Sequence, residues 1–172
     1  MDNLWKKEFH ASRLGETPDS IIQAQCDFLQ EMTNGKIIAK CVSYDGYTKS
    51  YKVHSSLEQM SKMLQPKLHD IQNDLGEIEE TRFAYEFYIT CRTTPNYKYR
   101  IMFIEYGFMF YPVSITLDED IASEINIDTD VECDTQEDFN SILEKVLNSS
   151  KLEKLINNLL TLVDRHEALS GL

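Results

Sequence analysis

The segment Arg82–Arg92 constrains the fold more than any other part of the sequence. Apolar side chains occupy every second position across it, and they are Phe83, Tyr85, Phe87, Ile89 and Cys91. Successive side chains of a β-strand point to opposite faces of a sheet, so this alternation is typical of a strand with one buried face. The fold must therefore contain a sheet that is covered on one side.

Two more strands are predicted directly after this segment. Thr93–Asn96 has the residues of a turn and leads into Tyr97–Tyr106, and Gly107 separates that run from Phe108–Leu117. Such short connections favour consecutive antiparallel strands of one sheet. Pro112 has no backbone N–H to donate, so we expect the third strand to lie at an edge or to be bulged near this residue.

The first part of the chain predicts a helix followed by a hairpin. Thr17-Pro18 suits an N-cap and a first helical position, and Asn34-Gly35 suits a left-handed helix end. Two β-rich runs, Lys36–Tyr44 and Tyr47–His54, then flank Asp45-Gly46. An Asp-Gly pair between such runs is a strong signal for a β-hairpin.

Three further helices are predicted. Ser55 opens a capping-box pattern, and the apolar spacing that follows is helical, although Pro66 must kink or divide that helix. Thr135 caps the next helix. After a break at Asn148–Ser150, the last helix runs to about Leu169.

The predicted element order is α-ββ-α-βββ-αα. This order favours an α+β fold in which an antiparallel sheet is covered by helices. At 172 residues the chain has the length of one domain. We expect residues 1–172 to form that single domain, with 1–16 as an N-terminal extension and 118–134 as an acidic connection.

The net charge is −12, and all of the excess lies in one interval. Between Arg100 and Lys145 there are twelve Asp or Glu residues and no Lys or Arg, whereas the rest of the chain has 17 acidic and 17 basic residues. A surface of this kind repels nucleic acid and anionic membranes, and it steers a basic protein toward itself. The alternative is that the acidity serves only solubility.

The sequence favours a cytoplasmic protein. The first residues interleave acidic and basic side chains and lack the apolar core of a signal peptide. The longest apolar stretch, 101–117, is interrupted by polar residues, Gly107 and Pro112, so no membrane-spanning helix is predicted. The four cysteines have neither metal-ligand nor redox spacing, and we expect free thiols in a reducing compartment.

No catalytic, metal-binding or cofactor-binding residue is predicted. The six glycines are scattered singly, so there is no phosphate-binding loop or dinucleotide fingerprint. Three incomplete candidates remain open: His69-Asp70 as part of a metal site, the alternate carboxylates from Asp128 to Asp134 as a divalent-ion loop, and a Cys–His pair as a nucleophile. Each lacks the remaining ligands or the activating motif that its chemistry requires.

Aromatic side chains crowd the three central strands. Alternation directs most of these rings into the core. Tyr88 and Tyr106 are expected on the opposite face, where they would form an exposed aromatic patch suited to partner binding. A stacking platform for nucleic acid is disfavoured, because few basic residues stand beside the rings.

A helix with Pro18, Ile22 and Gln25 is followed by Thr33-x-Gly35 and, much later, by Tyr97-x-Tyr99 and Tyr111-Pro112-Val113. This order resembles a group of small bacterial α+β proteins that carry no functional label. The resemblance implies a bacterial or phage origin, and it implies no activity, cofactor or site.

These observations predict a small acidic binding protein that neutralises or regulates a basic protein partner, in the manner of immunity proteins and inhibitors. The predicted partner-binding residues are Asp118, Glu119, Asp120, Asp128, Asp130, Glu132, Asp134, Tyr88 and Tyr106. One alternative is a chaperone-like adaptor whose apolar helix stripes hold a client, or a second copy of the chain in a homodimer. The other is a hydrolase with an unrecognised carboxylate or metal site. Neither nucleic acid nor membrane is a predicted partner.

Overall fold

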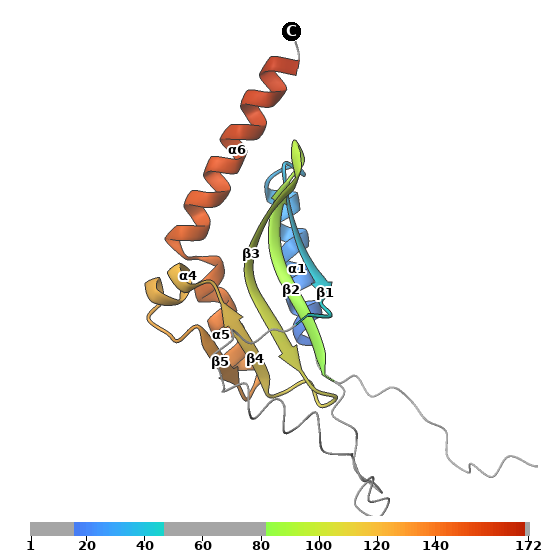
Figure 1. The fold of residues 1–172 in the computed structure, drawn as a ribbon, viewed down its shortest axis with the longest axis vertical. Helices are drawn as coiled ribbons and strands as arrows, with labels where there is room; N and C mark the ends of the chain where they lie inside the picture. The colour runs from blue at the N-terminus through green and yellow to red at the C-terminus, as the bar shows by residue number, and fades with distance from the viewer. Residues whose placement is uncertain (1–15, 47–81, 171–172) are drawn as a thin grey trace, which may run out of the picture.

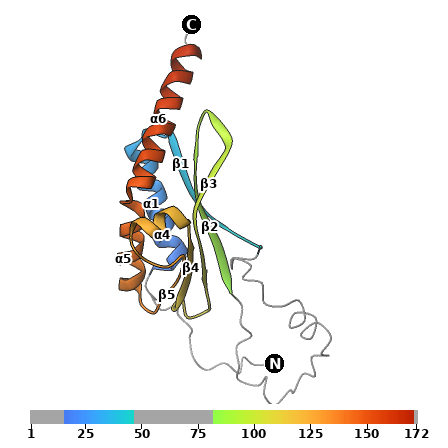
Figure 2. The same ribbon diagram turned by 60° about the vertical axis from the view of Figure 1, so that its left-hand side comes forward.

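A computed structural model describes residues 16–46 and 82–170, and it shows an α+β fold. The sheet has five antiparallel strands in the order β1-β2-β3-β4-β5, so each strand pairs with its neighbours along the chain (Figure 1). Helices α1, α5 and α6 lie together on one side of this sheet (Figure 2). Contacts of α1 and α6 with β1, and of α5 with β5, hold the two layers together. The predicted fold class is confirmed.

The three central strands are confirmed as consecutive antiparallel partners. They are β2 (Phe83–Cys91), β3 (Thr94–Tyr106) and β4 (Val113–Leu117). The turn between β2 and β3 is tighter than expected, because Thr94 already pairs with Cys91. Pro112 precedes the first residue of β4. It therefore removes no hydrogen bond from the ladder, and β4 lies inside the sheet instead of at the expected edge.

The first helix and strand follow their sequence signals. Helix α1 (Pro18–Met32) begins after Thr17, and the chain leaves it through Asn34 and Gly35, whose φ angles of 51° and 71° are left-handed. Strand β1 (Ile37–Ser43) then pairs with β2. The predicted second arm of the hairpin (47–54) and the helix that starts at Ser55 lie outside the described residues.

The acidic connection 118–134 contains two elements that the sequence analysis did not separate. Helix α4 (Glu119–Glu124) buries Ile121 and Ala122. Strand β5 (Asp130–Cys133) pairs with β4 and becomes the edge of the sheet. Because acidic and apolar residues alternate along β5, its carboxylates point away from the core while Val131 and Cys133 face it.

The last two helices are α5 (Gln136–Leu147) and α6 (Ser150–Ser170), and the predicted break between them is confirmed. Buried Ser149 marks this break, and its hydroxyl donates to the carbonyl of Val146 at 2.8 Å. The C-terminal end of α6 extends beyond the tip of the β2–β3 hairpin (Figure 1). None of the helices within the described residues has the length and apolar character needed to cross a membrane.

The core fills the space between the sheet and the helices. Its largest fully buried side chain is Phe139 of α5, which packs among apolar residues of the sheet and the helices. By contrast, Phe108 in the connection between β3 and β4 is 61% exposed. These two phenylalanines provide a matched test of the core.

We predict that Phe139→Ala lowers the free energy of unfolding by about 3–5 kcal/mol, because it removes a buried ring and leaves a cavity. Phe108→Ala should change it by less than about 0.5 kcal/mol, since its ring is already in water. Urea unfolding of both variants measures the two values. Equal losses would contradict the described core.

Candidate functional site

The acidic residues gather on α4, β5 and the start of α5, at the end of the sheet away from β1 (Figure 1). This placement brings Asp118–Asp120 and Asp128–Asp134 together, as chain continuity predicts. The structure divides these carboxylates into two groups. Some have a structural partner, and others have none within the described residues.

The carboxylates around α4 hold helix ends. Asp118 is the N-cap of α4, and its side chain accepts hydrogen bonds from the backbone N–H groups of Asp120 and Ile121. Asp120 forms an ion pair with Lys151 of α6 at 2.6 Å. These two residues were predicted to bind a partner, but both carboxylates already have partners inside the protein.

Glu124 joins α4 to the first turn of α6. Its two carboxylate oxygens accept the backbone N–H groups of Ser150 at 2.5 Å and Lys151 at 3.0 Å. These N–H groups lack partners within their own helix, and the helix dipole also favours a negative charge there. The Ser150 N–H is the main reason that the pKa of Glu124 is lowered. The sequence analysis assigned no role to this residue.

Two more carboxylates have local roles. Thr135 is the predicted N-cap of α5, and its hydroxyl accepts the backbone N–H of Asp138 and donates to the Asp138 carboxylate. Asp130 on β5 accepts a hydrogen bond from the hydroxyl of Thr116 on β4 at 2.9 Å. This bond crosses the outer face of the sheet.

Glu105 of β3 pairs with Arg82 at 3.0 Å, and the remaining carboxylates of the interval form what we call the open acidic surface. All of its members are exposed and make no hydrogen bond or ion pair with the described residues, and they are Glu119, Asp128, Glu132, Asp134, Glu137 and Glu144. Four of them belong to the predicted partner-binding set. The fold gives these charges no internal role that we can identify.

Tyr88 and Tyr106, which were predicted to form an exposed aromatic patch together, lie on different faces of the sheet. Tyr106 is only 4% exposed and lies on the helix-covered face, where its hydroxyl donates to Asp19 of α1 and its ring stacks on Tyr85. Its predicted exposure is wrong. Burial, and then the bond to Asp19, raises the pKa of the Tyr106 hydroxyl far above its usual range.

Tyr88 lies on the outer face, beside a buried carboxylate. The ammonium of Lys98 sits 4.1 Å from the centre of its ring and also contacts Glu86, which is 6% exposed. Arg100 donates to the same carboxylate at 2.9 Å. Burial acts to raise the pKa of Glu86, but the bonds from Lys98 and Arg100 outweigh it, so the pKa is lowered.

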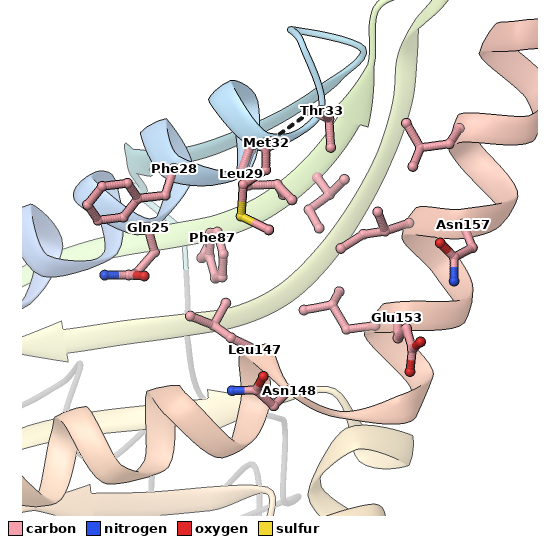
Figure 3. A pocket seen from close by; sticks show the side chains of 15 residues that line it. Gln25, Phe28, Leu29, Met32, Thr33, Phe87, Leu147, Asn148, Glu153 and Asn157 are labelled. Atoms are coloured by element: carbon pink, nitrogen blue, oxygen red, sulfur yellow. Dashed lines mark hydrogen bonds between the residues drawn. The ribbon is translucent and has the colours of Figure 1, made fainter.

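An open apolar groove of about 550 Å³ lies between α1 and α6 (Figure 3). Its floor consists of Ala39 on β1 together with Phe87 and Ile89 on β2. Its walls are Phe28, Leu29 and Met32 from α1, and Leu147, Leu152, Ile156 and Leu160 from α5 and α6. Sequence analysis predicted the apolar stripes of these helices but not the space between them.

The lining of the groove includes a carboxylate but no basic side chain. Glu153 of α6 is the acidic member, and Gln25, Thr33, Asn148 and Asn157 are the polar ones. Helix α1, which forms one wall, contains three acidic residues and neither Lys nor Arg. The groove therefore continues the negative character of the molecule.

The pKa values of the four thiols shift in different directions. Burial raises the pKa of Cys26 and of Cys41 to about 12, and that of Cys133 to about 11. At Cys91 burial also acts to raise the pKa, but bonds with the Thr94 and Thr93 hydroxyls outweigh it and lower the pKa. Of the four histidines, His166 alone falls within the described part of the chain.

No metal site emerges from the part of the chain that the structure describes. Within residues 16–46 and 82–170, no three His, Cys, Asp or Glu side chains are grouped so that they could share a metal ion. On β5, Asp130 and Glu132 stand on the outer face of the sheet, and Asp130 is bonded to Thr116. His69-Asp70 lies outside the described residues.

Comparisons of the chain with protein-family models, with curated proteins and with solved structures return no match.

We predict that Glu124→Ala lowers the thermal midpoint, because two N–H groups at the start of α6 lose their acceptor. Glu132→Ala removes an equally charged and exposed side chain without such a bond and should leave the midpoint unchanged. Differential scanning calorimetry at neutral pH compares the two variants. An unchanged midpoint in Glu124→Ala would show that the carboxylate does not support α6.

The lowered pKa of Glu86 predicts a pH-dependent loss of stability. Its ionised form stabilises the fold above the ordinary pKa of 4.5, and this contribution is lost as pH falls through the lowered pKa of the folded state. Glu86→Gln should therefore cost about 1 kcal/mol of unfolding free energy at pH 7, and the difference from wild type should shrink in acid. Urea unfolding between neutral and acidic pH measures this difference. A constant difference would contradict the assignment.

Proposed function

We propose that this protein binds a basic protein partner in the cytoplasm and neutralises or regulates it, as an immunity protein or inhibitor does. The observation that carries the proposal is the open acidic surface, whose carboxylates are exposed and have no partner in the described chain. Charges with a structural role cannot serve as evidence for a partner, and Asp118, Asp120 and Glu124 are therefore set aside.

Long-range attraction explains why such a surface favours a protein partner. Clustered charges of one sign raise the rate of encounter with a partner of the opposite sign, and this effect weakens as salt screens it. The carboxylates lie on α4, β5 and α5 or, for Asp128 and Asp134, within two residues of β5, and these elements are held together by the sheet and the helix caps. A surface on such elements presents its charges in a fixed arrangement.

The thiols support the cytoplasmic part of the proposal. All four cysteines lie within the described residues, and none of them forms a disulfide. Free buried thiols are usual in reducing compartments, whereas small exported domains commonly use disulfides.

The test uses the quadruple variant Glu119→Gln, Asp128→Asn, Glu132→Gln and Asp134→Asn, which changes only members of the open acidic surface. The partner is first captured from a native lysate with the wild-type protein and identified, and association is then measured by stopped flow over a range of salt. We expect the variant to associate more slowly, by about tenfold at low salt, with a flatter salt dependence.

Stability provides the control for this variant. Exposed charges contribute about 0–1 kcal/mol each, so the quadruple variant should unfold close to the wild-type midpoint. If its association rate and salt dependence equal those of the wild type, the acidity serves solubility and the proposal is wrong.

A further inference from the structure

The α1–α6 groove has a length and shape that the open acidic surface does not explain. It extends along α1 from Gln25 to Met32 and along α6 from Leu152 to Leu160. At about 1.5 Å per residue, these stretches are about 10 Å and 12 Å long, which is two helical turns. Two turns match the distance between the i, i+4 and i+7 side chains of a helix that docks by its apolar face.

The wall formed by α1 leaves large apolar side chains in water. Phe28 is 56% exposed and Met32 is 80% exposed, and both line the groove. Single exposed apolar residues are common on proteins, but here two of them flank an apolar hollow. An occupant of the groove would remove both from water.

The charges around the groove select among possible occupants. Glu153 lines it, and Glu31 is exposed on the surface of α1, three residues after Phe28 and next to it. Further along α6, Asp164 and Glu167 continue the stripe of Glu153 and are paired with Lys36. A fatty acid or a phosphate headgroup would bring negative charge to this lip, and a second copy of a chain with net charge −12 would do the same.

We propose that the α1–α6 groove binds the apolar face of a basic amphipathic helix presented by the partner protein. Three apolar side chains of that helix lie between the walls of α1 and α6, against the exposed Phe28 and Met32. Lysine or arginine side chains beside them reach Glu31 and Glu153. The inference rests on the proposed function, because it takes the partner to be a basic protein, and it adds the surface on which the partner is anchored.

Helix α4, which carries Glu119 of the open acidic surface, meets the groove at the first turn of α6. Glu124 of α4 caps Ser150 and Lys151, and the next residue, Leu152, lines the groove. A helix attracted by the carboxylates of α4 and β5 is thus delivered to the end of the groove. Steering acts mainly on the association rate, and buried anchors act mainly on the dissociation rate.

The test uses the full chain and a synthetic probe, a fluorescent leucine–lysine peptide of about 18 residues, or five helical turns. Its leucines stand at i, i+4 and i+7 spacing. One control peptide has the same composition in scrambled order, and a second keeps the leucines but replaces each lysine by glutamate. Fluorescence anisotropy gives the affinity, and stopped flow gives the rates.

Two double variants of the protein locate the site. Phe28→Ser with Met32→Gln removes the exposed anchors of the groove. Phe108→Ser with Met109→Gln makes the same substitutions at residues that are 61% and 74% exposed, outside the groove lining. Both pairs leave the charge unchanged, so electrostatic attraction is the same in the two variants.

We expect the leucine–lysine peptide to bind the wild type more tightly than either control peptide does. The Phe28/Met32 variant should bind it about tenfold more weakly or worse, mainly through faster dissociation, and the Phe108/Met109 variant should bind like the wild type. Equal binding of the scrambled peptide, or equal losses in the two double variants, would overturn the proposal. A wild-type dimer in sedimentation that only the Phe28/Met32 variant dissociates would overturn it as well, because a second copy would then occupy the groove.

Failure of this inference can be told apart from failure of the proposed function. If the quadruple acidic variant loses association rate while the Phe28/Met32 variant binds the peptide normally, the groove is not the anchor and the proposed function stands. If the native partner ignores the quadruple substitution while peptide binding requires Phe28 and Met32, the groove inference stands and the steering role is wrong.

Discussion

Burial of one face of the five-stranded sheet determines where every described helix can lie. The inward side chains of β1 to β5 are apolar, and α1, α5 and α6 cover them from one side. Phe139 of α5 is fully buried in this layer, whereas a groove remains between α1 and α6, above the buried Phe87 and Ile89 of the sheet. The contacts that position α6 therefore also set the width of the groove, and Glu124 and Lys36 make two of them.

Local signals predicted most of the fold. The alternation in Arg82–Arg92, the helix start after Thr17 and the N-cap at Thr135 depend only on near neighbours, and the structure has each of them. Strand β5 depends instead on pairing with β4, which lies across α4 in the sequence. Its four residues include two carboxylates, so propensity gave no sign of a strand.

The candidate site was less predictable, because it depends on register and on distances between elements. The pairing of β2 with β3 shifts where Phe87 faces Met102 and Tyr88 faces Arg100, so that Ile101 has no partner. This shift changes which β3 residues face the core, and it places Tyr106 inside while Tyr88 stays outside. Likewise, the roles of Asp120 and Glu124 require the contact between α4 and α6, which no spacing in the sequence reveals.

In the proposed mode of binding, the carboxylates attract the partner and the groove holds its helix. Amide hydrogen exchange tests most directly whether the helix binds in the groove. Exchange is compared for the full chain alone and with saturating leucine–lysine peptide. The account predicts slower exchange in the segments 25–33 and 152–160, which form the two walls of the groove. Protection confined to α4 and β5, or no protection in either wall, would contradict it.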